Sequence, residues 1–245
     1  ELLAASLHGM LTNPSTPWFT LRFKQDNVEN EDEAKLWLES ATDAMYTAFN
    51  RSNFQQEIFE LYHDLITFGT AAMFIEEDEE DFIKFSTRHI DEVYIAENDK
   101  GRIDTIYRRF NLSARAVVQK FGTAVSQDIL VLEKKDPYKE VEIVHAVYPR
   151  ADFNPTKKDK KNMPFESVYM EYKNGNELSV SGFKEFPFVV PRYLKASHEI
   201  YGRSPAMTAL PDVKMLNEMV KTTIKAAQKQ VDPPLLVPDD GFLLP

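Results

Sequence analysis

The spacing of apolar residues predicts helices in the first seventy residues of the chain. Residues 2–11 have the pattern of a short helix, and the sequence TNPSTPW ends it, because residues that precede proline are disfavoured in helical conformation. A second helix is expected to begin in the acidic cluster Glu31–Glu33, where negative charge suits a helix N-terminus. Ser52 or Asn53 can cap a third helix, and Gly69 is expected to end it.

Beyond Gly69 the period changes to that of β-structure. Short runs rich in β-branched and aromatic residues predict strands, namely AAMFIEED, FIKFS, EVYIAEN, RIDTIYRRF and EVEIVHAVYP. Asn98–Gly101 and Asn174–Gly175 predict hairpin turns, and SARAVVQKFG is expected to be a short helix. The pattern of DILVLEKK fits a helix or a strand, and the helix is favoured. Pro187 and Pro191 confine the run FPFVVPRYL to a sheet edge. The predicted class is α+β, with helices first, mostly antiparallel strands in the middle and one long helix last.

The C-terminal block predicts that long helix and both of its ends. Ser204 can act as its cap, and Pro205 fits the first turn, where a missing N–H costs nothing. Pro211 lies further in and predicts a kink or a fresh helix start. The sequence Asp232-Pro233-Pro234 is expected to stop the helix, because proline cannot continue the hydrogen-bond ladder.

This helix is predicted to have two different faces. At about 100° per residue, four lysines fall within an arc of roughly 80°, with Glu218 between them. The lysines are Lys214, Lys221, Lys225 and Lys229. The opposite arc holds Val213, Leu216, Val220, Ile224, Ala227 and Val231. In a monomer this pattern describes an ordinary amphipathic helix with a solvated lysine face, and a functional role requires several copies of the stripe to meet a polyanion.

Composition and charge narrow the class of protein. The chain has 245 residues, 43% of them hydrophobic, which is enough for one or two cores, and no apolar run reaches the roughly 18 residues of a membrane span. The opening residues ELLAASLHGM have the pattern of a helix that begins before the first residue, so further residues are expected upstream. The absence of cysteine excludes disulfides and thiolate metal sites.

The net charge of −10 is unevenly distributed. From Tyr201 to Asp232 there are five basic and three acidic residues, a net charge of +2, so the rest of the chain carries −12. A strongly acidic chain argues against general electrostatic adhesion to nucleic acid or to an anionic membrane.

No motif of catalytic chemistry is present. The five histidines are scattered, without a partner three or four residues away, and each is expected to be structural. The acidic run from Glu76 to Asp81 favours a solvated turn over a cation-binding loop, because its carboxylates are consecutive and no glycine interrupts them. The sequence GTAAMF lacks the second glycine and the GK[ST] ending of a phosphate-binding loop. We therefore expect no catalytic residue, no metal and no cofactor, with an acid-rich, metal-dependent hydrolase or nuclease as the alternative class.

Several collinear segments resemble one family along essentially the whole chain. They are LHGMLTNPSTPWFTL, LYHDLITFGTAAMFIEED, VHAVYPR, FPFVVPRYLKASHEIYGRSP, LPDVKMLNEM and QVDPPLLVPDDG. The motif residues among them are Tyr201, Gly202, Arg203, Ser204, Pro205, Asp232, Pro233 and Pro234. In this order the segments resemble the portal proteins, the head-to-tail connectors of short-tailed, podovirus-type bacteriophages.

The resemblance implies a non-catalytic virion protein. Portal proteins form a ring, usually of twelve copies, at one capsid vertex, through which DNA is packaged by a terminase and later ejected into the tail. The implied partners are further copies of the chain, the terminase large subunit, tail adaptor proteins, capsid and scaffolding proteins, and double-stranded DNA, with assembly in the host cytoplasm and no membrane. Another head-completion or tail-adaptor protein is the alternative within the virion.

The resemblance also implies a division of the chain. Residues 1–202 would form the wing, residues 203–232 the stem helix and residues 233–245 the start of the clip, with the rest of the clip, a second stem helix and the crown outside this chain. The apolar residues Val213, Leu216, Val220, Ile224 and Val231 would pack between subunits. The lysines would either line the DNA channel or pair with acidic faces of neighbouring subunits, and both arrangements agree with the sequence.

Overall fold

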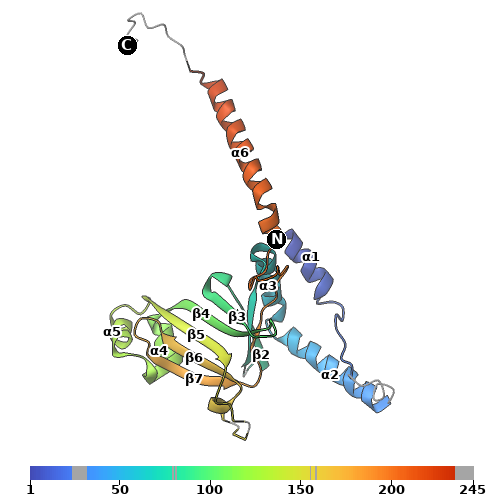
Figure 1. Ribbon diagram of the computed structural model, residues 1–245, viewed down its shortest axis with the longest axis vertical. Coiled ribbons are helices and arrows are strands. Elements are labelled where there is room, and N and C mark those ends of the chain that lie inside the picture. Colours follow the sequence, from blue (N-terminus) through green and yellow to red (C-terminus); the bar gives the residue numbers. More distant parts are fainter. Residues whose placement is uncertain (24–31, 79, 81, 155, 158, 235–245) are drawn as a thin grey trace, which may run out of the picture.

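The architecture was analysed in a computed structural model that describes residues 1–23, 32–78, 80, 82–154, 156–157 and 159–234. Three helices come first, α1 (Leu2–Leu11), α2 (Asp32–Arg51) and α3 (Phe54–Phe68). Two antiparallel sheets follow, and the long helix α6 (Pro205–Val231) comes last. Figure 1 shows α6 as a rod that projects from the body, and α2 as a second projection in another direction. The α+β class and the predicted order of elements are confirmed.

The strands form a small and a large sheet. The small sheet has the order β2-β1-β8 and consists of β1 (Ala72–Asp78), β2 (Phe82–Arg88) and β8 (Phe188–Val189). The large sheet has the order β3-β4-β5-β6-β7, with β3 (Val93–Glu97), β4 (Ile103–Ser113), β5 (Glu140–Pro149), β6 (Phe165–Glu171) and β7 (Glu177–Phe183). The strand β8 lies at a sheet edge, as its flanking prolines predict. Both predicted hairpin turns are present, and each places a glycine at positive φ, Gly101 at 70° and Gly175 at 64°.

The small sheet is buried on both faces, because its side chains alternate between two partners. On one face, Met73 and Phe85 pack against α3. On the other face, Phe74 and Phe188 pack against Ile106 and the neighbouring residues of the large sheet. The small sheet therefore lies between α3 and the large sheet.

Two short helices, α4 (Ala114–Phe121) and α5 (Gln127–Lys135), cover the rest of that face of the large sheet. Val117 and Ile129 pack there against Phe110 and Ile143. The side chain of Ser113 caps α4 by accepting a hydrogen bond from the N–H of Ala116. The helical prediction for DILVLEKK is also confirmed.

An aromatic corner holds α2 to α3. Trp18 stacks on Phe54, with ring centroids 5.9 Å apart and an interplanar angle of 8°. The Tyr46 hydroxyl accepts hydrogen bonds from the N–H groups of Trp18 and Phe19, at 2.6 and 2.7 Å. These contacts satisfy the backbone of the proline-rich corner, so Trp18 and Phe19 anchor packing.

The start of α3 departs from the expected capping. Asn53 occupies the N-cap position, but its side chain bonds both the N–H and the carbonyl of Phe85 in β2. The Ser52 hydroxyl instead accepts a hydrogen bond from the N–H of Phe54. Asn53 therefore ties α3 to the small sheet. At the other end Gly69 terminates α3 in the left-handed conformation, with φ at 80°.

Of the two outcomes predicted at Pro211, a kink or a fresh helix start, the fresh start does not occur. One helix of 27 residues runs through Pro211. Proline lacks only its own N–H, and its fixed φ lies in the helical range, so the helix continues past it at a cost in stability.

The acidic run is described only in part. Its residues Glu76–Asp78 belong to β1, and positions 79 and 81 lie outside the described residues.

Across the described part of the chain, no helix combines the length and the apolar character that crossing a bilayer requires.

One buried histidine makes the stability of this fold depend on pH. His145 on β5 is 2% exposed, stacks on Tyr169 with ring centroids 3.9 Å apart, and has Nε2 2.9 Å from the Ser167 hydroxyl. Burial, followed by the charges of Lys120, Arg108 and Arg88, lowers the pKa of His145 from 6.5 to about 3. Between these two values the unfolded chain binds a proton that the folded chain does not.

The fold should therefore lose stability as the pH falls below 6.5, because protonation favours the unfolded state. From pH 7 to pH 5, His145 should account for a loss of about 2 kcal/mol in the free energy of unfolding. Urea unfolding of the wild type and of His145→Gln at both pH values measures this loss. The drop should be smaller by that amount in the variant, and equal drops in the two proteins would contradict the prediction.

Candidate functional site

The motif YGRSP forms the joint that connects α6 to the body. Ser204, which is 2% exposed, caps α6 by accepting a hydrogen bond from the N–H of Met207 at 2.9 Å. The same hydroxyl donates to the carbonyl oxygen of Thr67 in the last turn of α3, also at 2.9 Å. Pro205 follows at the first helical position. One side chain therefore starts the long helix and fixes it to another helix.

Two glycines allow the backbones to cross at this joint. A Cβ atom on Gly202 would lie 2.3 Å from the Gly69 carbonyl oxygen, and one on Gly69 would lie 2.4 Å from the Gly202 carbonyl oxygen. The N–H of Gly202 donates to the Thr70 hydroxyl at 2.7 Å, and Thr70 is 1% exposed. No other residue fits at either glycine position without moving the backbone.

Tyr201 connects the joint to the large sheet. Its hydroxyl accepts a hydrogen bond from the N–H of Ile95 at 3.2 Å and donates to the Val93 carbonyl oxygen at 3.5 Å. Strand β3 is the edge of that sheet, so Tyr201 partners backbone groups that would otherwise face solvent. The base of α6 is therefore attached to α3 and to the large sheet at once.

Arg203 contributes through its backbone and through an ion pair. Its N–H donates to the Leu194 carbonyl oxygen at 2.7 Å. Its guanidinium forms two hydrogen bonds with Glu199, at 2.5 and 2.9 Å. This pair lowers the pKa of Glu199 and raises that of Arg203. Arg203 thus stabilises the approach to the helix, and its charge is already balanced within the chain.

Beyond the joint, α6 is free of the rest of the chain. None of its residues is buried. At about 1.5 Å per residue its 27 residues extend about 40 Å. The predicted packing residues are exposed by about half or more, namely Val213 (48%), Leu216 (58%), Val220 (50%), Ile224 (53%) and Val231 (88%). The stripe of apolar side chains that the sequence predicts to be packed has no partner within the described chain.

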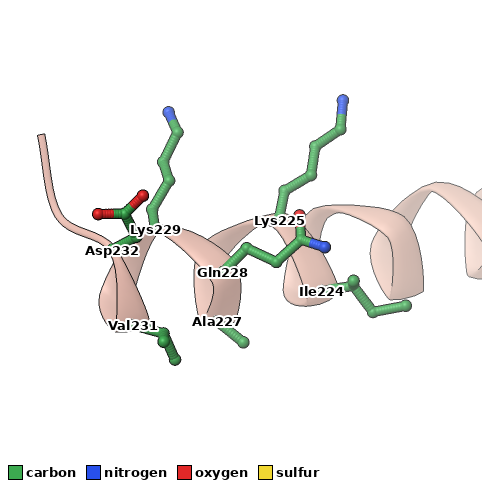
Figure 2. A pocket seen from close by; sticks show the side chains of 7 residues that line it. All are labelled: Ile224, Lys225, Ala227, Gln228, Lys229, Val231 and Asp232. Atoms are coloured by element: carbon green, nitrogen blue, oxygen red, sulfur yellow. The ribbon is translucent and has the colours of Figure 1, made fainter.

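The lysine face is separate from the apolar face. Figure 2 shows Lys225 and Lys229 on one side of the last turns, and Ile224, Ala227 and Val231 on the other. These residues, with Gln228 and Asp232, line a shallow hollow on the helix surface. Asp232 ends the helix, and its N–H donates to the Gln228 carbonyl oxygen.

The four lysines differ in their partners. Lys221 forms an exposed ion pair with Glu218, with Nζ and Oε1 3.1 Å apart. Within the described residues, Lys214, Lys225 and Lys229 form no ion pair. Such a face can attract an anion without shaping a pocket around it.

The partners of the motif are the part of the site that the sequence analysis missed. Thr67, Gly69 and Thr70 were not predicted to meet the motif, because they lie more than a hundred residues away in the chain. Of these three residues, only Gly69 is singled out by the sequence pattern, which predicts it as the end of α3. The described residues contain no group of three or more histidines and carboxylates arranged to hold a metal ion.

Comparisons with known proteins agree with the resemblance. The model of the family described as bacteriophage head to tail connecting protein matches residues 1–244. The portal protein of Salmonella phage epsilon15 is 34% identical over 243 residues, which are 97% of this chain and 44% of the relative. The probable portal protein of Bordetella phage BPP-1 is 32% identical over 242 residues, with the same coverage of 97% and 44%.

The similarity is continuous along the chain, but the chain spans less than half the length of these curated relatives. It includes the body, the joint and the exposed helix described above. The chain therefore belongs to the family of bacteriophage head-to-tail connecting proteins.

Proposed function

We propose that this chain is part of a portal protein, and that it forms a segment of the wall of a ring at one vertex of a phage capsid. The observation that carries the proposal is α6, which has 27 residues and none buried. The similarity to two proteins named as portal proteins supports it. In this proposal residues 1–202 are the wing, residues 203–232 the stem helix and residues 233–245 the start of the clip.

The apolar face of α6 requires a partner. An isolated amphipathic helix gains most of its stability from packing, and exposed Val220 and Ile224 give it none in a single chain. In a ring, identical helices stand side by side around one axis, and the apolar face of each can be covered by its neighbours. Packing between copies would therefore stabilise the helix and the ring together.

The lysine face is proposed to line the channel. If the apolar face is directed to neighbouring subunits, the opposite arc is left for the lumen. Lys214, Lys225 and Lys229 form no ion pair within the described residues, so their charges are available to the phosphates of double-stranded DNA. The charge of −12 on the rest of the chain would offset this attraction and keep the DNA mobile.

The ring is proposed to act without catalysis. A terminase large subunit would drive DNA through it, and tail adaptor proteins would bind it after packaging. Capsid and scaffolding proteins would surround it in the virion. The copy number of twelve and these partners come from the resemblance to portal proteins.

Assembly of the full-length protein tests this function. The wild type should form large rings, and Val220→Asp with Ile224→Asp should reduce them strongly, because two carboxylates would be buried between helices. Thr222→Asp with Ala226→Asp is the matched control, with the same spacing and charge outside the apolar arc. Light scattering after size exclusion and negative-stain imaging measure the rings. A full-length wild type that is strictly monomeric would contradict the function.

The channel role of the lysines is tested separately. Lys221→Glu with Lys225→Glu should leave rings intact and reduce the amount of DNA packaged, because four charge units per copy change in the lumen. Lys100→Glu with Lys173→Glu makes the same charge change at two exposed hairpin turns and should package normally. DNA content of purified heads is the measurement. Equal filling by both double variants would argue against lysines in the channel.

The joint can be tested at Gly202. The variant Gly202→Ala should destabilise the body by roughly 1–3 kcal/mol, because its Cβ atom would overlap the Gly69 carbonyl oxygen. Gly9→Ala in α1 is the control, since a Cβ atom there meets nothing within 4 Å. Thermal unfolding measures both variants. A Gly202→Ala protein as stable as the wild type would show that the crossing is not under steric constraint.

A further inference from the structure

A cluster of four cationic side chains lies where α4, β2 and the large sheet meet. It consists of Lys84 and Arg88 on β2, Arg108 on β4 and Lys120 on α4, and is called the basic cluster below. Neither the joint nor the lysine face of α6 includes any of these residues. The cluster is notable because the chain as a whole carries a net charge of −10.

Strand register and ring contacts place the members of the cluster near one another. Arg108 pairs with His145, and His145 with Tyr169, so the three side chains form a row across β4, β5 and β6. Lys120 lies over the Tyr169 ring, with Nζ 4.6 Å from the ring centroid. Arg108 of β4 and Lys120 of α4 therefore lie on the two sides of the buried His145.

The small sheet brings the other two cations to the same place. Phe74 pairs with Ser86, and the neighbouring pairs on the same face are Glu76 with Lys84 and Ala72 with Arg88. Lys84 and Arg88 therefore share a face of the sheet with Phe74. The Phe74 ring contacts the His145 ring, with centroids 5.8 Å apart. Lys84 and Arg88 thus approach the row from the opposite side.

The cluster has fewer anions than cations. Glu92 pairs with Arg108, with Oε2 and Nε 2.8 Å apart, and Glu76 lies across from Lys84 on β1. No ion pair joins Lys84, Arg88 or Lys120 to a carboxylate of the described residues. Four cations and two carboxylates leave a net charge of +2, and His145 is neutral near pH 7.

This arrangement costs free energy in the isolated chain. Burial lowers the pKa of Lys120, and the charges of Arg88, Arg108 and Lys84 lower it further, against the opposing effect of Glu76. Burial and Arg88 likewise lower the pKa of Arg108. A partner that brings several carboxylates would relieve the repulsion between these cations and offset the cost of their desolvation.

Helix α2 has the matching chemistry. Asp32, Glu39 and Asp43 are exposed, and at about 100° per residue they fall within an arc of roughly 40°. None of the three forms an ion pair within the described residues. Only Leu38 and Thr42 of α2 are buried, and Figure 1 shows the helix leaving the body on the side opposite α4 and α5.

We propose that the acidic face of α2 of one copy binds the basic cluster of the next copy in the ring. The proposal rests on the proposed portal function. In a closed ring, each interface joins two different surfaces of the same chain, so a projecting acidic helix on one flank and a cationic site elsewhere can meet. Three carboxylates would then face the three cations that lack an ion pair.

A charge swap in the full-length protein tests this contact. Arg88→Glu with Lys120→Glu should weaken ring assembly about tenfold in protein concentration, and Asp32→Lys with Asp43→Lys should weaken it similarly. All four substitutions together should restore most of the assembly, because the charges are exchanged. The control Lys100→Glu with Lys173→Glu should assemble as the wild type does. Light scattering across a protein dilution series is the measurement.

The outcomes separate this inference from the function on which it rests. A wild type without rings would contradict the portal function, whereas normal rings in the Arg88 and Lys120 variant would contradict this inference alone. If the four substitutions together do not restore assembly, the inference is also overturned.

Folding of the reversed variant is checked by thermal unfolding. If Arg88→Glu with Lys120→Glu does not fold, Arg88→Gln with Lys120→Gln replaces it. The neutral variant should assemble more weakly than the wild type at low salt, and the difference should shrink as salt screens the contact. A difference that does not depend on salt would overturn the electrostatic contact.

Discussion

The close crossing of Gly69 and Gly202 is the constraint on which the rest of the arrangement depends. It brings the end of α3 and the start of α6 within backbone contact, and both positions exclude a Cβ atom. The hydrogen bonds from Gly202 to Thr70 and from Ser204 to Thr67 then fix α6 at this point. Because Tyr201 reaches the edge of the large sheet, the direction in which the helix leaves the body is set by α3 and by the sheet together. A rigid base is what allows a helix without buried residues to have a defined direction.

The apolar face of α6 has no packing partner within the described residues. Its body has three clusters of buried apolar residues, whereas Leu216, Val220 and Ile224 remain half exposed or more. No other element of the described residues covers them. The packing that α6 lacks must therefore come from outside the described residues, and in the proposed ring contacts between copies would supply it. Membership in the head-to-tail connecting family gives this requirement a biological setting.

Local features could be predicted from the sequence, and non-local ones could not. The Ser204 cap, the end of α3 at Gly69 and the two hairpin turns depend on a few consecutive residues, and all are confirmed. Asn53 was expected to be one of two possible caps, but it bonds Phe85, which is 32 residues away. At Pro211 the sequence predicts a kink or a fresh helix start, and the fresh start does not occur, because proline has a helical φ and lacks only its own N–H. The partners of the joint and the basic cluster come from distant elements, so no local pattern could reveal them.

The lysine face of α6 and the basic cluster both carry cations that lack ion-pair partners within the described residues. On α6, cations are exposed and partly unpaired, and solvent lowers their cost. At the basic cluster, burial lowers the pKa of Arg108 and of Lys120, and the charge of Arg88 lowers both further, so the same charges cost more. The two sets therefore suit different partners. Exposed lysines around a channel would favour weak, mobile contact with a polyanion, whereas desolvated cations favour a fixed partner with carboxylates. A chain with a net charge of −10 can supply that partner from its own neighbouring copies.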